Sequence, residues 1–358
     1  MYLAADSGAD GGNLLVSKKA VTLKDVARLA ETTPMTVSNV LNNRAGSVGP
    51  ELSARVRRVA QELGYRPHAL ARRLRTQRSQ IIGVVLVDAS PFFLSDPLTG
   101  AMLAGLTAAL HRLDYSTILH GVGPDEVEQA SFLRNIETDG VCMVLSGSKS
   151  TRRRVVERVV ATNQPLVMMQ EEVPDDIRDA ACIYFDDRGG GRELARALVT
   201  DAVRHVLFLV PALEWPAMQR REAGIREVLA KRPDIRLSVV KSANESFEAC
   251  QAALAAFLLK GDVPDVIIGG NDQMAIAAMR YLQDIGRNVP RDIQIAGFNG
   301  LEFGRYTTPE LTTVAAPAFR LGEAAANAMF HRLDTGSFPF REMVVPVEVI
   351  LRASTRSR

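Results

Sequence analysis

Two different spacings of hydrophobic residues divide the chain into a short front part and a long rear part. Up to about residue 64, apolar residues recur every three or four positions, which is the spacing of amphipathic helices. From Ile81 onward, short apolar runs alternate with stretches of helical spacing. This alternation is typical of parallel sheets that are covered by helices on both faces. We therefore expect a small all-α domain followed by an α/β body.

The front part predicts three helices. Thr22 is a good N-cap, because an acidic residue three positions later completes a capping box. Thr33 can cap a second helix that begins at Pro34, where the missing N–H costs nothing. Pro50 opens a third helix, and Gly64 ends it. Two short helices with a tight turn and a supporting third helix fit the helix-turn-helix plan. The periodicity alone fits an unrelated three-helix bundle equally well.

The rear part predicts at least nine strands. So many strands separated by helices favour two parallel sheets over a single one. Helical spacing is clearest over residues 99–113 and 247–259. The predicted strands are residues 81–87, 116–120, 141–145, 166–169, 182–185, 206–210, 237–240, 266–268 and 293–296.

Charge is distributed unevenly along the chain. From Lys18 to Gln80, thirteen Lys and Arg stand against four Asp and Glu, whereas residues 81–358 are mildly acidic and the net charge is only +2. A basic front joined to an acidic body is the electrostatic pattern of a polyanion-binding domain linked to a second function. A solvated charged face would give the same counts, so charge alone does not decide.

Other kinds of site are poorly supported. The three cysteines and five histidines have no metal-ligand or catalytic-triad spacing, so we expect no metal, no cofactor and no catalytic residue. No run of 18 apolar residues is present, so we expect no membrane span. Residues 1–20 are interpreted as a disordered leader, since their longest apolar run is too short for a signal peptide. We therefore expect a cytoplasmic protein.

Several motifs follow one another in order through the front part, namely Val21-Thr22-Leu23-Lys24-Asp25-Val26-Ala27, Thr36-Val37-Ser38, Leu41-Asn42 and Gly64-Tyr65-Arg66-Pro67. These motifs resemble the LacI family of bacterial regulators, and the likeness extends from about Val21 to Thr355. One departure is Glu31, which stands in the turn where the family usually has Gly. Glu adopts such a turn conformation less easily than Gly, and it adds a negative charge near the expected DNA.

The resemblance implies a domain organisation. Residues 21–66 would form the helix-turn-helix domain, and residues 67–80 the hinge helix and linker. The body, residues 81–358, would resemble periplasmic sugar-binding proteins, with two parallel-sheet subdomains that close on a ligand. The implied subdomains are residues 81–180 with 314–337, and residues 181–313 with 338–354.

The resemblance also implies DNA contacts. Pro34, Met35 and Asn39 occupy positions that read operator bases in the family. Thr36 and Ser38 match positions that contact the DNA backbone. Two further residues complete the set expected on the head, namely Thr22 at the start of the first helix and Asn42, which supports the next loop.

The arginine-rich linker resembles the hinge helix of the family. About eight residues are too few for a stable isolated helix, so we expect this segment to become helical only on DNA, where phosphates neutralise its arginines. Leu74 matches the leucine that the family inserts into the minor groove, and Ala71 and Arg72 would lie beside it. An ordinary basic linker with an incidental leucine is the alternative.

Four residues match ligand-binding positions of the family, namely Gln170, Arg221, Asn271 and Asn299. Gln170 and Asn299 stand where relatives have aspartate, which would make the cleft less negative. Since Arg221 could pair with an anion, we hypothesise a sugar acid or a sugar phosphate as the effector.

Together these features predict a dimeric repressor of carbohydrate or sugar-acid utilisation genes that binds a palindromic operator under effector control. Helices such as residues 98–112 are the expected dimer interface. Whether the effector releases or tightens DNA binding stays open. An enzyme is one alternative, with Gly189-Gly190-Gly191 before a helix as a weak phosphate-binding loop. A transport binding protein is the other, but it would need a signal peptide and no basic head.

Overall fold

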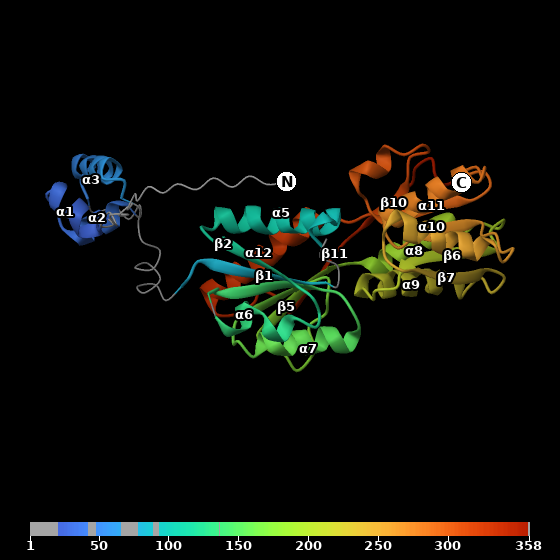
Figure 1. Ribbon diagram of the computed structural model, residues 1–358, viewed down its shortest axis with the longest axis horizontal. Helices are drawn as coiled ribbons and strands as arrows, with labels where there is room; N and C mark the ends of the chain where they lie inside the picture. The colour runs from blue at the N-terminus through green and yellow to red at the C-terminus, as the bar shows by residue number, and fades with distance from the viewer. Residues whose placement is uncertain (1–20, 42–47, 66–77, 89–92, 136, 357–358) are drawn as a thin grey trace, which may run out of the picture. The chain divides into compact units, whose positions relative to one another are not determined.

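A computed structural model describes residues 21–41, 48–65, 78–88, 93–135 and 137–356 of the chain. These residues form two compact units, a head that ends at Arg78 and a body that begins at Ser79 (Figure 1). The predicted leader and the predicted hinge helix lie outside the described residues, so both stay predictions.

The head consists of α1 (Leu23–Leu29), α2 (Pro34–Leu41) and α3 (Pro50–Glu62). Thr22 caps α1 with the capping box that the sequence predicts. Its hydroxyl accepts the N–H of Asp25 at 3.4 Å, and its own N–H donates to the Asp25 carboxylate at 2.9 Å. Only two side chains of α2 are fully buried, so most of this helix remains available for other contacts. The core of the head is Val26, Ala27, Ala30, Val37, Val40, Val56, Val59 and Ala60.

The body contains two six-stranded sheets. The first has the order β11-β5-β4-β3-β1-β2 and is parallel throughout. The second has the order β12-β10-β9-β8-β6-β7, and only β12 runs antiparallel to its neighbour. This confirms the predicted fold class. The strands are β1 (Ile81–Val87), β2 (Ser116–Val122), β3 (Gly140–Leu145), β4 (Leu166–Met169), β5 (Ala180–Phe185), β6 (His205–Pro211), β7 (Arg236–Ser242), β8 (Val266–Gly269), β9 (Gln294–Asn299), β10 (Thr312–Ala315), β11 (Glu342–Val345) and β12 (Glu348–Ile350).

Helices cover both faces of each sheet. We call the first sheet with its helices the first lobe, and the second sheet with its helices the second lobe. In the first lobe α5 and α12 pack on one face and α7 on the other, so the sheet separates two hydrophobic cores (Figure 1). The second lobe repeats this arrangement. The helices are α5 (Pro97–Arg112), α6 (Ser131–Arg134), α7 (Lys149–Val160) and α12 (Ala318–Thr335) in the first lobe, and α8 (Asp187–Leu198), α9 (Pro216–Leu229), α10 (Phe247–Leu258) and α11 (Asp272–Asp284) in the second.

The chain passes between the lobes three times, after β5, β10 and β11. The structure thereby moves all three predicted subdomain boundaries. The strand at residues 180–185 belongs to the first sheet, although a boundary was expected at 180/181. The strand at residues 312–315 belongs to the second sheet, although a boundary was expected at 313/314. The strand at residues 342–345 pairs with residues 182–185 in parallel and belongs to the first lobe, although residues from 338 were assigned to the second. In each case the chain completes its strand before it leaves the sheet.

Two glycines bring α8 and α9 into backbone contact. A Cβ atom at Gly191 would lie 2.3 Å from the carbonyl oxygen of Arg221, and one at Gly224 would lie 2.0 Å from the carbonyl oxygen of Arg188. The glycine run therefore serves close packing of the two helices. It also lies within α8 and not before a helix, where the N–H of Gly190 donates to the carbonyl oxygen of Asp186 at 2.8 Å. The interpretation of this run as a phosphate-binding loop is wrong.

Candidate functional sites

The exposed side of α2 carries side chains that the sequence assigns to DNA. Val37 and Val40 are fully buried against α1 and α3, which fixes the orientation of the helix. Met35 on the opposite side is 72% exposed. Ser38 and Asn39 are partly exposed and follow Met35 by three and four positions, so they lie on the same helix face. A helix that exposes such a face fits the width of the DNA major groove.

Two of the residues assigned to DNA also stabilise the head. Thr22 caps α1, as described above. The hydroxyl of Thr36 lies 2.9 Å from that of Thr33, and its N–H donates to the Thr33 hydroxyl at 3.2 Å. Thr33 therefore caps α2, as its position predicts, and Pro34 is exposed at the first position of the helix. The other residues assigned to DNA, namely Asn42, Ala71, Arg72 and Leu74, lie outside the described residues.

Glu31 occupies the turn between α1 and α2 with a φ of 51°. This value lies in the left-handed region, which favours glycine. The side chain is exposed. The departure from the family pattern thus falls on a position where a non-glycine residue is strained.

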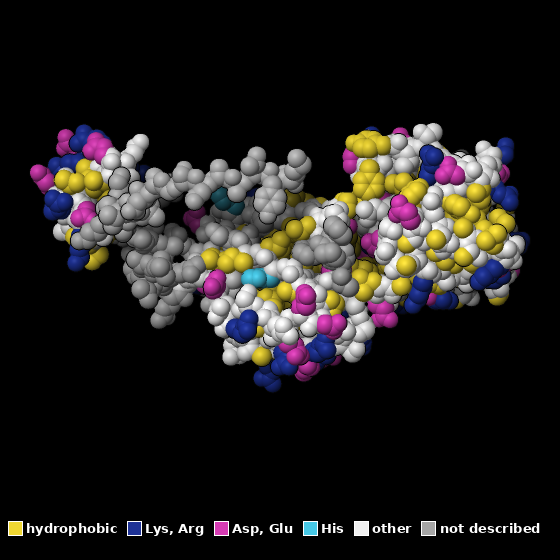
Figure 2. Space-filling model, in the orientation of Figure 1, with side chains coloured by type: hydrophobic (Ala, Val, Ile, Leu, Met, Phe, Trp, Pro, Cys, Tyr) yellow, Lys and Arg dark blue, Asp and Glu magenta, His cyan; other side chains and the backbone are white. Residues whose placement is uncertain are grey.

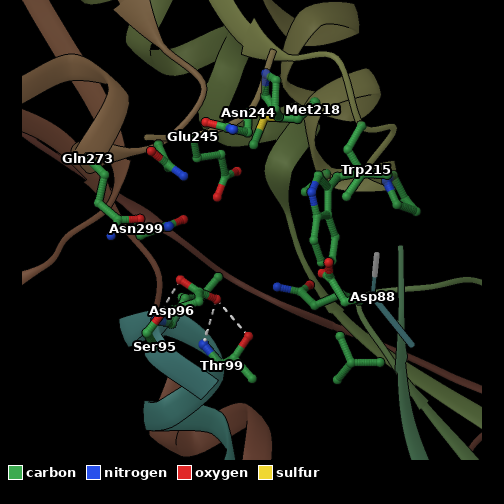
Figure 3. Close-up of a pocket in the computed structure, with 18 of the residues that line it drawn as sticks. Asp88, Ser95, Asp96, Thr99, Trp215, Met218, Asn244, Glu245, Gln273 and Asn299 are labelled. Atoms are coloured by element: carbon green, nitrogen blue, oxygen red, sulfur yellow. Dashed lines mark hydrogen bonds between the residues drawn. The ribbon is translucent and has the colours of Figure 1, made fainter. Parts of the chain in front are cut away.

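A cavity of about 940 Å³ lies between the two lobes of the body (Figure 3). The four residues that the sequence assigns to the effector all line it, Gln170 from the first lobe and Arg221, Asn271 and Asn299 from the second. Most of them lie at or just beyond the carboxyl ends of parallel strands, where open α/β sheets bind their ligands. Apolar side chains of both lobes complete the wall, among them Leu98, Met102, Trp215 and Met218.

Arg221 is held by three hydrogen bonds deep in the second lobe. Its Nε donates to the carboxylate of Asp187 at 2.8 Å, and its terminal nitrogens donate to the carbonyl oxygen of Gly270 at 2.6 Å and to Asn299 Oδ1 at 3.1 Å. The guanidinium group also lies over the ring of Phe298, 4.5 Å from its centroid. Arg221 and Asp187 are both 2% exposed, so the charge of this arginine is already balanced by a buried partner.

The three predicted amide residues have positions fixed by the fold. Asn271 caps α11, since its Oδ1 accepts the N–H of Met274 at 2.9 Å. Gln170 accepts the backbone N–H of Phe185 at 3.2 Å. Both Gln170 and Asn299 have a positive φ, of 68° and 105°. Such strained backbone at a cavity wall is common where a side chain must be aimed at a ligand.

Sequence reasoning missed three carboxylates of the cavity, namely Asp88, Asp96 and Glu245. The expectation of a less negative cleft did not take these three carboxylates into account. Burial, with the nearby carboxylates of Asp96 and Asp88, raises the pKa of Glu245 to about 7, although Arg221 and a hydrogen bond to Asn271 act in the opposite direction.

Two family models match the chain. The model of the lacI family of bacterial regulatory proteins matches residues 22–68, and that of a periplasmic binding protein-like domain matches residues 195–355. The chain belongs to the LacI family. The two models thus cover the helix-turn-helix head and residues 195–355 of the body.

Curated members of the LacI family align with almost the whole chain. The ribose operon repressor of Haemophilus influenzae is 26% identical over 94% of this chain and 99% of its own length. The transcriptional repressor PurR of Vibrio parahaemolyticus is 27% identical over 94% and 98% of the two chains. Catabolite control protein A of Priestia megaterium is 24% identical over 94% and 99%.

Solved structures of LacI-family proteins have the same fold. The lac repressor dimer bound to operator and to an anti-inducer has a TM-score of 0.80 and 25% identity, and the match covers 95% of this chain and 100% of that one. A complex of the regulator CelR with cellobiose has a TM-score of 0.68 and 23% identity over 93% and 99% of the two chains. At this second level of identity, the likeness shows the fold alone.

Membership of the LacI family decides the broad function. The protein is a DNA-binding transcriptional repressor with an effector-binding body, and its relatives are repressors and not enzymes. Within the described residues, no helix is both long and apolar enough to cross a membrane.

Proposed function

We propose that this LacI-family repressor binds a palindromic operator as a homodimer and that a small polar metabolite in the interlobe cavity sets its affinity for DNA. The observation that carries the proposal is the cavity itself, whose wall comes from both lobes. A ligand that touches both lobes binds one arrangement of the lobes better than another, and this difference in affinity shifts the protein between states.

The exposed face of α2 supports the assignment of base contacts to Pro34, Met35 and Asn39. An asparagine side chain can form two hydrogen bonds with the edge of an adenine. Thr22, Thr36, Ser38 and Asn42 would contact the backbone or hold the neighbouring loop. For the hinge, we keep Leu74 as the wedge in the minor groove, flanked by Ala71 and Arg72.

Features of the first lobe support a dimer. β2 is an edge strand of its sheet, and Leu119 on it is 41% exposed. Two further large apolar side chains of this lobe, Leu94 just before α5 and Phe319 on α12, are also about half exposed. Exposed apolar side chains of this kind are typical of surfaces that another subunit covers. A two-fold dimer would place two heads on two half-sites of one operator.

The charges of the cavity bear on the effector. Carbohydrates remain a suitable class, because amide and carboxylate oxygens around an apolar wall accept hydrogen bonds from hydroxyl groups. The sugar acid and sugar phosphate that the sequence suggested are disfavoured, since three carboxylates line the cavity and Arg221 is already paired.

A selection of duplexes from a random pool, followed by binding measurements, tests the proposal. We expect a two-fold symmetric site, and the Asn39→Ala variant should lose at least about tenfold in affinity for it while binding random DNA normally. The matched control is Gln61→Ala on α3, an exposed residue of the same domain. Recovery of no preferred sequence, or equal losses for both variants, would contradict the proposal.

A further inference from the structure

One short segment of the second lobe touches both the interlobe cavity and the first lobe. It runs from Glu214, just before α9, to Arg221 in the second turn of that helix. Trp215, labelled in Figure 3, and Arg221 line the cavity. The carbonyl oxygen of Glu214 accepts the N–H of Gly147 at 3.0 Å, and Trp215 packs against the core that α5 and α12 form with the first sheet. Anything that displaces this segment therefore acts on the cavity and on the contact between the lobes together.

Arg220, next to Arg221 in α9, makes a further contact with the first lobe. One terminal nitrogen donates to the carbonyl oxygen of Gln170 at 3.0 Å, and the guanidinium carbon lies 4.6 Å from the centroid of the Tyr184 ring. The side chain of Arg220 is only 15% exposed. Gln170 itself lines the cavity with a φ of 68°, so Arg220 reaches a wall residue whose backbone is strained.

The contact made by Arg220 differs from the ion pairs of the outer surface. On the first lobe, Lys and Arg lie among Asp and Glu in open solvent (Figure 2), as in the pair of Arg158 and Glu128, whose side chains are both more than half exposed. Such pairs contribute little to stability. The enclosed charge of Arg220 is screened less by water, and it reaches Glu171 of the first lobe. Burial raises the pKa of the Glu171 carboxyl, while Arg152 and Arg220 act in the opposite direction.

Asp187 joins this contact to the cavity. One of its carboxylate oxygens accepts a hydrogen bond from Arg221 at 2.8 Å, and the other accepts one from Arg220 at 3.4 Å. Arg221 in turn donates to Asn299 Oδ1 at 3.1 Å, and Asn299 also lines the cavity. A continuous chain of hydrogen bonds therefore connects the cavity wall of the first lobe with that of the second, and Arg220 is its link at the boundary between the lobes.

We propose that Arg220 is a positioning residue that couples the effector cavity to the arrangement of the two lobes. The inference rests on the proposed function, in which a ligand in this cavity sets the affinity for DNA. Arg220 stabilises the arrangement in which its guanidinium group meets Gln170 and Tyr184. A ligand that binds Gln170 or Arg221 acts on the same chain of hydrogen bonds. Removal of the link shifts the population of lobe arrangements even without a ligand, because the contact stabilises only one of them.

Quenching of Trp215 fluorescence by acrylamide tests the contact in the ligand-free, full-length protein. Trp215 is the only tryptophan of the chain, and it packs against the first lobe, so its accessibility reports on the arrangement of the lobes. Arg220→Met removes the charge and the hydrogen bonds but keeps an apolar stem. Loss of a hydrogen bond to a charged group shifts an equilibrium by about tenfold. We therefore expect stronger quenching, together with a change of at least about threefold in affinity for the selected operator.

Two further variants separate this contact from a general effect of the substitution. Tyr184→Leu removes the aromatic partner on the first lobe, and it should change quenching and operator affinity in the same direction as Arg220→Met. The double variant should change operator affinity by less than the product of the two single changes, because both remove parts of one contact. Arg220→Lys keeps the charge and should lie between Arg220→Met and the unchanged protein, and it covers the case in which Arg220→Met folds poorly.

Val156→Ala is the control for a general loss of stability. Val156 is buried on α7, in the core on the opposite face of the first sheet from α5 and α12. Its truncation should lower the free energy of unfolding in urea but leave quenching and operator affinity of the folded protein unchanged.

Three results would overturn the inference: unchanged quenching and operator affinity in both Arg220 variants, fully multiplicative effects in the double variant, or equal changes in Val156→Ala. The quenching measurement needs no DNA, so it tests the contact by itself. Failure of the unchanged protein to select any operator refutes the proposed function, whereas normal operator selection with unresponsive Arg220 variants refutes the role of Arg220 alone.

Discussion

Replacement of Gly224 by alanine tests how the position of Arg221 is set. A Cβ atom there would lie 2.0 Å from the carbonyl oxygen of Arg188 and 2.7 Å from the backbone nitrogen of Arg192, and Cβ atoms essentially never approach closer than 3.0 Å. Both obstacles are backbone atoms of α8, which no side-chain rotation can remove. The two helices would have to separate by about 1 Å.

The expected cost follows from two opposing terms. Overpacking of this kind destabilises by about 1–3 kcal/mol, whereas alanine in a helix interior gains up to about 1 kcal/mol over glycine. We expect a net loss of about 1–2 kcal/mol in the free energy of unfolding. Arg221 lies one turn before Gly224 on α9, so a shift of the helix would also disturb its hydrogen bonds of 2.6–3.1 Å. Effector binding should weaken together with stability.

Urea unfolding followed by circular dichroism measures the first effect, and Trp215 fluorescence follows the cavity. Gly100→Ala on α5 is the matched control, since no heavy atom lies within 4 Å of its added Cβ. The control should be as stable as the unchanged protein, or more stable by up to about 1 kcal/mol. If Gly224→Ala proved as stable as Gly100→Ala, the account of α8 and α9 as helices in obligatory backbone contact would be refuted.

Three further predictions concern the head, the cavity and the contact between the lobes. Glu31→Gly should raise the stability of the head by about 1 kcal/mol by relieving its positive φ, and an unchanged head transition in thermal denaturation would speak against this strain. The pKa of Glu245 is raised to about 7 in the folded protein. Between about pH 4.5 and pH 7 the native state therefore binds more protons at this group than the unfolded state does. The stability that this protonation contributes is present below this range and is lost as the pH rises through it. Urea unfolding should therefore find Glu245→Gln more stable than the unchanged protein by about 1–2 kcal/mol at pH 8 and about equal to it at pH 4.5, and a constant difference would refute the assignment. Arg220 of the second lobe donates to the carbonyl oxygen of Gln170 at 3.0 Å, and its guanidinium carbon lies 4.6 Å from the centroid of the Tyr184 ring. Arg220→Lys should therefore lower the free energy of unfolding in urea by about 1–2 kcal/mol. The control Arg226→Lys, on the exposed side of α9, should leave this free energy nearly unchanged.

Much of the fold could be predicted from the spacing of apolar residues. All nine strands predicted from the sequence are present, because each is a short apolar run with turn residues at its ends. The three missed strands lack this signal. β10 buries Thr312 and Thr313, whose hydroxyl groups are satisfied by partners distant in sequence. β11 and β12 lie at the edges of their sheets and have only exposed and half-buried positions.

Some residues of the cavity could likewise be predicted from the sequence, and others could not. Gln170, Arg221, Asn271 and Asn299 could be located because they match the motifs of a known family. The carboxylates could not, since an acidic residue after a strand or before a helix most often caps or is solvated, as Asp96 also does. The charge available on Arg221 was misjudged for a related reason. Its partner Asp187 is 34 positions away in the sequence, and only the tertiary fold brings the two together.

The passage of the chain between the lobes sets an order for folding during synthesis. Helix α12 supplies Leu321, Ala325, Ala326 and Met329 to the largest core of the first lobe, and β11 closes one edge of its sheet. A nascent chain that has emerged only as far as β10 can complete most of the second lobe, while the first still exposes the apolar face that α12 will cover. The lobe made first therefore waits for α12 and β11 until most of the second lobe has been made, and it is the one that depends most on protection from aggregation before the chain leaves the ribosome.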